Sequence, residues 1–182
     1  MAKVMVVLPT YNEADNLAPM VHTLLELPIE GLEILVVDDN SPDGTGQIAD
    51  GLAEACPGRV HVLHRDKKEG LGKAYKAGFR QSIALGADLI VQMDCDFSHP
   101  PEKLPEMVAQ AATYDMVLGS RYVQGGRLDE EWGWERKLLS WWANRVYIGL
   151  ILRTRTADAT AGYKVWNRRV LQGIDLDRIK SE

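Results

Sequence analysis

Two aspartates separated by one residue, Asp94 and Asp96, are the side chains of this sequence best suited to chemistry. They follow a short apolar run, and in an extended segment residues i and i+2 point to the same side. Two carboxylates held side by side repel each other unless a cation joins them. Mg²⁺ and Mn²⁺ prefer oxygen ligands, take one or two carboxylates and complete their shell with water and substrate phosphates. The pair therefore predicts a divalent cation site that anchors a diphosphate.

A structural role for the same pair is the alternative. Asp96 would then cap the following helix, and Asp94 would be a solvated strand end. A motif this short does not decide between the two roles, so the elements that position it and the other motifs of the chain have to be considered.

Short runs rich in β-branched residues alternate with stretches of helical character, which predicts five strands and four helices. The expected strands are Val4–Leu8, Glu33–Val37, Val60–His64, Leu89–Met93 and Met116–Gly119. The expected helices cover about 13–27, 44–56, 71–85 and 101–113. This alternation predicts an α/β fold with a mostly parallel sheet flanked by helices on both faces. Ligands of such sheets bind outside the carboxyl ends of the strands, where Asp94 and Asp96 stand.

Length and composition predict one globular domain, residues 1–182, with 46% hydrophobic and 26% charged residues. The longest apolar run, Val146–Leu152, is too short to cross a bilayer. A net charge of −5 argues against a protein whose main function is to bind nucleic acid. Residues 1–120 carry 9 basic and 18 acidic side chains, whereas residues 121–182 carry 12 and 8, so the last third is the part suited to an anion. Two cysteines without CxxC spacing and no secretory signal favour a cytoplasmic protein.

Six motifs, taken together, resemble the family 2 glycosyltransferases with the GT-A fold, and most closely the polyprenol (dolichol) phosphate mannosyltransferases. The resemblance covers nearly the whole chain. The segments that carry it are Val7–Asn16, Val36–Thr45, Gly70–Tyr75 with Gly78, Met93–Glu102, Gly119–Tyr122 and Ala161–Lys164.

The resemblance implies inverting transfer of mannose from GDP-mannose to a polyprenyl phosphate, with Mg²⁺ or Mn²⁺ as cofactor. It places residues 1–120 at the nucleotide sugar and residues 121–182 at the acceptor. Asp96 and Arg121 are the implied catalytic residues. The residues that would hold the nucleoside are Pro9, Tyr11, Glu13, Val37 and Asp39. The metal and the diphosphate would be held by Asp94, Cys95 and Asp96, with Ser98 near the metal. The residues that would bind phosphate are Arg121, Arg136 and Lys164.

Simpler roles remain open for some of these residues. Tyr11 is also suited to packing at a helix entry, Asp39 to forming a turn, and Arg136 to a solvated surface. Relatives with Gln in place of Ser98 leave a direct metal contact by Ser98 open. Since a phosphate acceptor is already anionic at neutral pH, no general base is required, and we expect His99 to be a loop residue.

The segment after Tyr122 contains four tryptophans within eleven positions, and residues 136–153 are expected to form a helix that is apolar nearly all round. Such a helix suits peripheral contact with the cytoplasmic face of a membrane. Burial against a further part of the protein or in a homodimer is the alternative. The family's catalytic domain usually continues past Glu182, so we expect the C-terminal boundary to be artificial.

Two other functions are retained for comparison. One is a different family 2 transferase, with a UDP-glucose donor or a saccharide acceptor; a saccharide would require a catalytic base, for which no convincing candidate follows Tyr122. The other is a non-catalytic nucleotide-binding module of the receiver type. The chain's length, and its two acidic pairs at separate strand ends, argue against the module.

Overall fold

The computed structural model describes residues 2–120 and 161–179. The chain divides into two compact units, one formed by Met1–Val117 with Tyr163–Glu182 and the other by Leu118–Gly162. The first unit contains nearly all the described residues. The helix expected at residues 136–153 lies outside them, and the assignment of all 182 residues to one catalytic domain stays a prediction.

Four parallel strands form the centre of the sheet. They are β1 (Val4–Thr10), β2 (Leu32–Asp38), β3 (Val60–His64) and β4 (Leu89–Gln92). The strand order of the whole sheet is β3-β2-β1-β4-β6-β5. Every residue of β1 is buried, as expected for a central strand covered on both faces. The predicted positions of these four strands are confirmed to within a few residues.

Strand β1 continues two residues beyond its predicted end, through Pro9 to Thr10. Its pairing with β4 stops at Val7 opposite Gln92, whereas its pairing with β2 continues through Pro9 opposite Val37. Pro9 therefore lies where β1 has only one neighbouring strand, so its missing N–H interrupts no second ladder.

Two further strands complete the sheet. Strand β5 (Met116–Leu118) was expected, but β6 (Lys164–Asn167) was not. Strand β6 runs antiparallel to β4, with Lys164 opposite Gln92. It leads directly into the short helix α6 (Arg168–Gly173). The sheet is therefore mixed at this side and parallel elsewhere.

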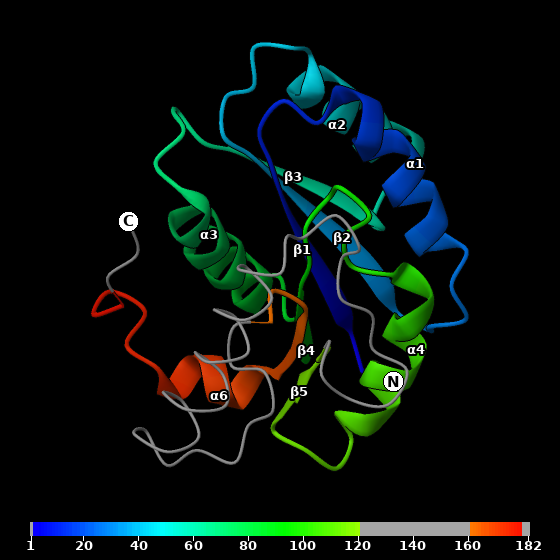
Figure 1. Cartoon of the computed structure of the whole chain (residues 1–182), viewed down its shortest axis with the longest axis vertical. Coiled ribbons are helices and arrows are strands. Elements are labelled where there is room, and N and C mark those ends of the chain that lie inside the picture. Colours follow the sequence, from blue (N-terminus) through cyan, green and yellow to red (C-terminus); the bar gives the residue numbers. More distant parts are fainter. Residues whose placement is uncertain (1, 121–160, 180–182) are drawn as a thin grey trace, which may run out of the picture. The chain divides into compact units, whose positions relative to one another are not determined.

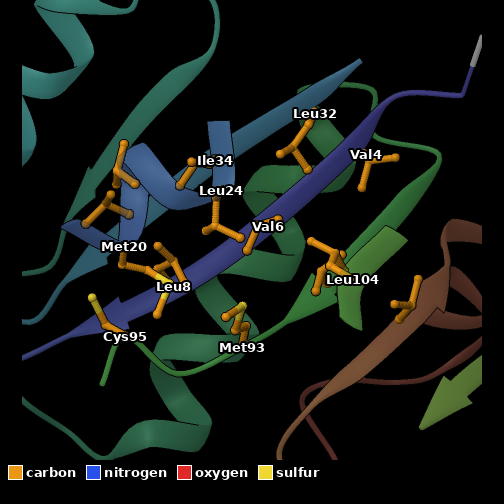
Figure 2. Packing of buried hydrophobic residues seen from close by; sticks show 14 of the residues in the cluster. Val4, Val6, Leu8, Met20, Leu24, Leu32, Ile34, Met93, Cys95 and Leu104 are labelled. Carbon is orange, nitrogen blue, oxygen red and sulfur yellow. The ribbon is translucent and has the colours of Figure 1, made fainter. Parts of the chain in front are cut away.

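Helices cover both faces of the sheet (Figure 1). They are α1 (Ala14–Leu25), α2 (Thr45–Ala55), α3 (Leu71–Ala84) and α4 (Leu104–Gln110), the last preceded by a 3₁₀ turn at Pro101–Lys103. Buried residues of α1, α2 and α4 pack with Val4, Val6 and Leu8 of β1, and Figure 2 shows part of this cluster. Residues of α3 and α6 pack with Met5 and Val7 on the other face. The predicted α/β architecture, with helices on both faces, is confirmed.

Helix α3 approaches the sheet very closely at Gly78. A Cβ atom there would lie 2.4 Å from Val7 Cγ1 and 3.2 Å from Val37 Cγ2, so only glycine fits without a shift of the Val7 side chain or of the helix. This contact fixes the height of α3 above the strands that end at the candidate site. In residues 2–120 and 161–179, no helix is long and apolar enough to cross a membrane.

Candidate active site

The candidate site is built from the loops that follow the parallel strands. The register places Thr10 of β1 beside Asp38 of β2, and Asp38 beside His64 of β3, so the carboxyl ends of these strands form one edge. Tyr11, Asp39 and Arg65 are the next residues along the chain. Strand β4 ends at Gln92, opposite Val7 of β1, and leads through Met93 to Asp94.

In the loop after β4, Asp94 is half-buried and Asp96 is exposed, whereas Cys95 is packed in the core. Cys95 is 2% exposed and belongs to the buried cluster that contains Leu8 and Met20, as Figure 2 shows. Burial, together with the nearby carboxylates of Glu13, Asp96 and Asp94, raises the pKa of the Cys95 thiol to about 12. The thiol is therefore neutral and packed in the core, and only the backbone of Cys95 is available to a ligand.

Asp94 is held through both its side chain and its backbone. The Tyr75 hydroxyl of α3 donates a hydrogen bond of 2.5 Å to Asp94 Oδ1. The Asp94 N–H donates to Nδ1 of His99 at 3.0 Å. Because Nδ1 accepts this bond, its ring carries a proton on Nε2 when neutral, so the 3.9 Å approach of Nδ1 to Asp94 Oδ2 is not a charge pair in that state.

Asp96 is held by its own loop and does not cap a helix. Its Oδ1 accepts the Ser98 N–H at 3.0 Å, and neither the 3₁₀ turn nor α4 has a side-chain cap. Burial acts to raise the pKa of Asp96, but hydrogen bonds from Ser98 and the nearby His99 outweigh it and hold the pKa below its usual value. Asp96 is thus ionised at neutral pH. The alternative in which Asp96 caps the next helix is wrong.

The residue after Asp96 has an unusual backbone. Phe97 adopts φ 59°, in the left-handed region, which is costly for a bulky side chain. Phe97 is also 41% exposed, so burial of its ring does not offset the cost. The strained turn brings the Ser98 N–H back onto Asp96.

Asp39 lies at the end of β2 and is paired with Arg65. Arg65 Nη1 donates to Asp39 Oδ1, and the two side chains are only 12% and 6% exposed. The Asp39 N–H donates to the Thr10 carbonyl at 3.0 Å, which fixes the backbone as well. Both residues stand just beyond the ends of predicted strands, but the sequence did not predict that they pair.

Tyr11 is exposed at the same edge. Its relative exposure is 36%, and the Lys68 ammonium lies over its ring, 3.9 Å from the centroid. Packing at the helix entry, the simpler role considered for Tyr11, stays an alternative at this exposure. Two other residues assigned to the nucleoside, Pro9 and Val37, are buried partners in the β1–β2 register.

The loop after β2 holds the loop after β1 through side-chain oxygens. The backbone N–H groups of Asn12, Glu13 and Ala14 donate to Ser41 Oγ, Thr45 Oγ1 and Asp43 Oδ2, at 3.1, 2.9 and 3.1 Å. Asp43 also accepts from the Thr45 hydroxyl, which is the main cause that lowers the Asp43 pKa. The segment Ser41–Thr45 therefore holds the backbone of residues 12–14, including the predicted ligand Glu13.

Lys164 is the first residue of β6 and pairs with Gln92 of β4. Asp94 follows Gln92 by two residues. The register thus brings this predicted phosphate-binding lysine to the side of the β4 loop. Its ammonium lies 5.8 Å from the centre of the Trp166 ring. Arg121 and Arg136, the other two basic residues assigned to phosphate, lie outside the described residues.

Within residues 2–120 and 161–179, no three His, Cys, Asp or Glu side chains converge as a complete metal site. In the same part of the chain, neither Asp94 nor Asp96 forms an ion pair with lysine or arginine. The closest basic side chain is that of His99, whose Nδ1 lies 3.9 Å from Asp94 Oδ2. What the described edge offers is two carboxylates without a lysine or arginine counter-ion, next to a buried Asp–Arg pair and an exposed tyrosine. This arrangement is suited to binding a cation together with an anionic ligand.

Comparison with known proteins gives consistent results. The model of glycosyl transferase family 2 matches residues 5–174. An undecaprenyl-phosphate mannosyltransferase of Micrococcus luteus is 45% identical over 180 residues, which are 99% of this chain and 72% of that protein. A polyprenol monophosphomannose synthase of Mycolicibacterium smegmatis is 46% identical over 181 residues, 99% of this chain and 67% of that protein.

Solved structures show the same fold. A mannosyltransferase of Pyrobaculum calidifontis in complex with GDP-Man and Mn²⁺ superposes with a TM-score of 0.65 at 21% identity, covering 95% of this chain and 46% of that one. Glucosyl-3-phosphoglycerate synthase of Mycobacterium tuberculosis, with Mn²⁺, UDP and glucosyl-3-phosphoglycerate, gives 0.61 at 25% identity, covering 95% and 59%. The chain thus spans about half the length of these solved proteins.

Proposed function

Because this chain belongs to glycosyl transferase family 2 and has its GT-A fold, we propose that it transfers mannose from GDP-mannose to the phosphate of a polyprenol, with inversion at the sugar. The observation that carries the proposal is the pair of carboxylates, half-buried Asp94 and exposed Asp96, at the carboxyl edge of the sheet. The names of the relatives that are 45% and 46% identical supply the sugar and the acceptor.

The residues of this edge fit a divalent cation. Both carboxylates offer hard oxygen ligands and lack a lysine or arginine partner among the described residues, and the low pKa of Asp96 keeps it ionised. Two carboxylates without a third protein ligand suit Mg²⁺ or Mn²⁺, which take their remaining ligands from water and phosphate. When bound, the cation would neutralise negative charge that builds on the departing GDP.

The nucleoside would lie against the other half of the edge. Asp39, fixed by Arg65 and by the Thr10 carbonyl, keeps acceptor capacity for the hydroxyl groups of a ribose or the N–H groups of a base. The ring of Tyr11, with the Lys68 ammonium over one of its faces, would lie beside it. Glu13, whose backbone is braced by Thr45, completes this part of the site together with the backbones of Pro9 and Val37.

No proton has to be removed from the acceptor, since its phosphate is already ionised. Lys164, Arg121 and Arg136 are proposed to bind phosphate, and the position of Lys164 beside the β4 loop supports its part in this. His99 fits this scheme because its Nδ1 accepts the Asp94 N–H and supports the loop. The protein's contribution is then to hold two anions in line against their mutual repulsion.

Residues 121–182 are proposed to form the acceptor side, with the apolar stretch 136–153 resting on the membrane that contains the lipid. The excess of basic over acidic residues in this third supports the proposal, because anionic headgroups attract such segments.

Transfer of labelled mannose from GDP-mannose to a short polyprenyl phosphate tests the function. We expect Asp96→Asn to reduce the rate by about 100-fold or more, since it removes one charge that binds the cation. Glu54→Gln is the matched control: it removes one exposed carboxylate of α2 and should leave the rate unchanged. Transfer from UDP-glucose in place of GDP-mannose, or an undiminished rate for Asp96→Asn, would contradict the proposal.

A further inference from the structure

Tyr75 is a buried tyrosine to which neither the motifs nor the proposed reaction assign a task. It lies in the second turn of α3 and is 5% exposed. Its ring stacks on Phe79, with centroids 5.8 Å apart. One turn further along the helix, Gly78 sets the distance of α3 from β1 and β2. The position of the Tyr75 hydroxyl is therefore fixed by packing on both sides of it.

In the described part of the chain, that hydroxyl donates to the carboxylate of Asp94. The 2.5 Å distance between Tyr75 Oη and Asp94 Oδ1 is typical of a hydrogen bond to an ionised carboxylate. A tyrosine hydroxyl has an ordinary pKa of about 10, so it is protonated at neutral pH and can donate this bond.

Asp94 and Asp96 differ in how they are held. Asp96 bonds within its own loop, to Ser98. Asp94 is tied by its side chain to α3 and by its backbone to His99, whose ring stacks on Tyr163 with centroids 5.2 Å apart. Within residues 2–120 and 161–179, Asp94 is the one of the two carboxylates that is anchored to a helix of the scaffold.

We propose that Tyr75 is a positioning residue, which fixes the carboxylate of Asp94 through Oδ1 and so sets the affinity of the site for its divalent cation. This inference rests on the proposed function, which supplies the cation. Hydrogen bonds to a metal-binding carboxylate orient it, and their loss typically lowers metal affinity 10- to 100-fold.

Tyr75→Phe tests the inference, because it removes the hydroxyl and keeps the ring that packs on Phe79. The probe is Mn²⁺ in the presence of GDP, with free Mn²⁺ counted by its electron paramagnetic resonance signal. We expect Mn²⁺ to bind the variant about 10-fold more weakly, whereas the affinity for GDP without metal and the melting temperature stay close to those of the wild type. In the transfer assay, a higher Mn²⁺ concentration should restore much of the lost rate, which it would not do for a distorted fold.

Two further variants separate positioning from general damage. Tyr114→Phe removes a hydroxyl that is exposed on the surface and should leave Mn²⁺ affinity unchanged. In an Asp94→Asn background, Tyr75→Phe should cause little additional loss, since the group it positions has already been altered. If the wild type binds Mn²⁺ and Tyr75→Phe binds it equally well, or if the two losses simply add, the inference is wrong. If the wild type itself binds no Mn²⁺ with GDP, the proposed function fails and the inference fails with it.

Discussion

At the residue scale, the site depends on side chains that hold one another before any ligand arrives. Asp39 and Arg65 are the clearest case, since both are nearly buried and the Arg65 guanidinium, which also pairs with the more exposed Glu69, is the counter-ion of Asp39. We expect Arg65→Met to lower the free energy of unfolding by about 3 kcal/mol, because it leaves a buried carboxylate without its partner. Urea denaturation measures this loss.

Arg80→Met is the matched control for that prediction. Arg80 pairs with Asp177, but these side chains are 53% and 83% exposed, so the loss should stay below about 1 kcal/mol. Equal losses for the two variants would mean that the Asp39–Arg65 pair is no more important than a surface ion pair.

The sequence identifies Asp39, Arg65 and Asp94 as residues of one sheet edge, because each follows a strand. It does not reveal which of them pair. The contact between Tyr75 and Asp94 joins residues 19 positions apart, and that between Asp39 and Arg65 joins residues 26 apart. Such pairs depend on the distance of α3 from the sheet, on its rotation about its axis and on the conformation of the loops. Local sequence periodicity does not predict any of these.

At the element scale, α3 is the helix on which the site's geometry depends most. We expect Gly78→Ala to destabilise the fold by about 2 kcal/mol, since the new methyl group would meet Val7 in a packed interior. Gly51→Ala in α2 has nothing within 4 Å and should be neutral or slightly stabilising, because alanine favours helix over glycine. Thermal unfolding of both variants checks this, and a Gly78→Ala protein as stable as the wild type would contradict the packing.

The strands and helices of the first 120 residues could be predicted because each is a continuous apolar run or a helix-length stretch between turn residues. Strand β6 could not. It has four residues, among them Lys164 and Asn167, and no alternation that distinguishes it from a loop. Its place between β4 and β5 requires the chain to return to the sheet after residue 160, a long-range event that local propensity does not determine.

At the scale of the whole molecule, ligands that bind only the folded chain should stabilise it. We expect GDP with Mn²⁺ at about 100 times the dissociation constant to raise the melting temperature by roughly 5 °C or more. UDP and ADP at the same concentrations should raise it less, and GDP in the presence of a chelator should lose most of its effect. Equal shifts for all three nucleotides, with or without metal, would favour a general nucleotide-binding module.

The location of the cation remains the most direct test. A crystal of the full chain grown with GDP and Mn²⁺, with data collected at the manganese absorption edge, gives the position of the metal independently of any assumption about the reaction. We predict one anomalous peak between the carboxylates of Asp94 and Asp96 and the diphosphate, at the carboxyl edge of β4. A peak elsewhere, with GDP bound away from Asp39, would contradict the proposed site and the transfer reaction built on it.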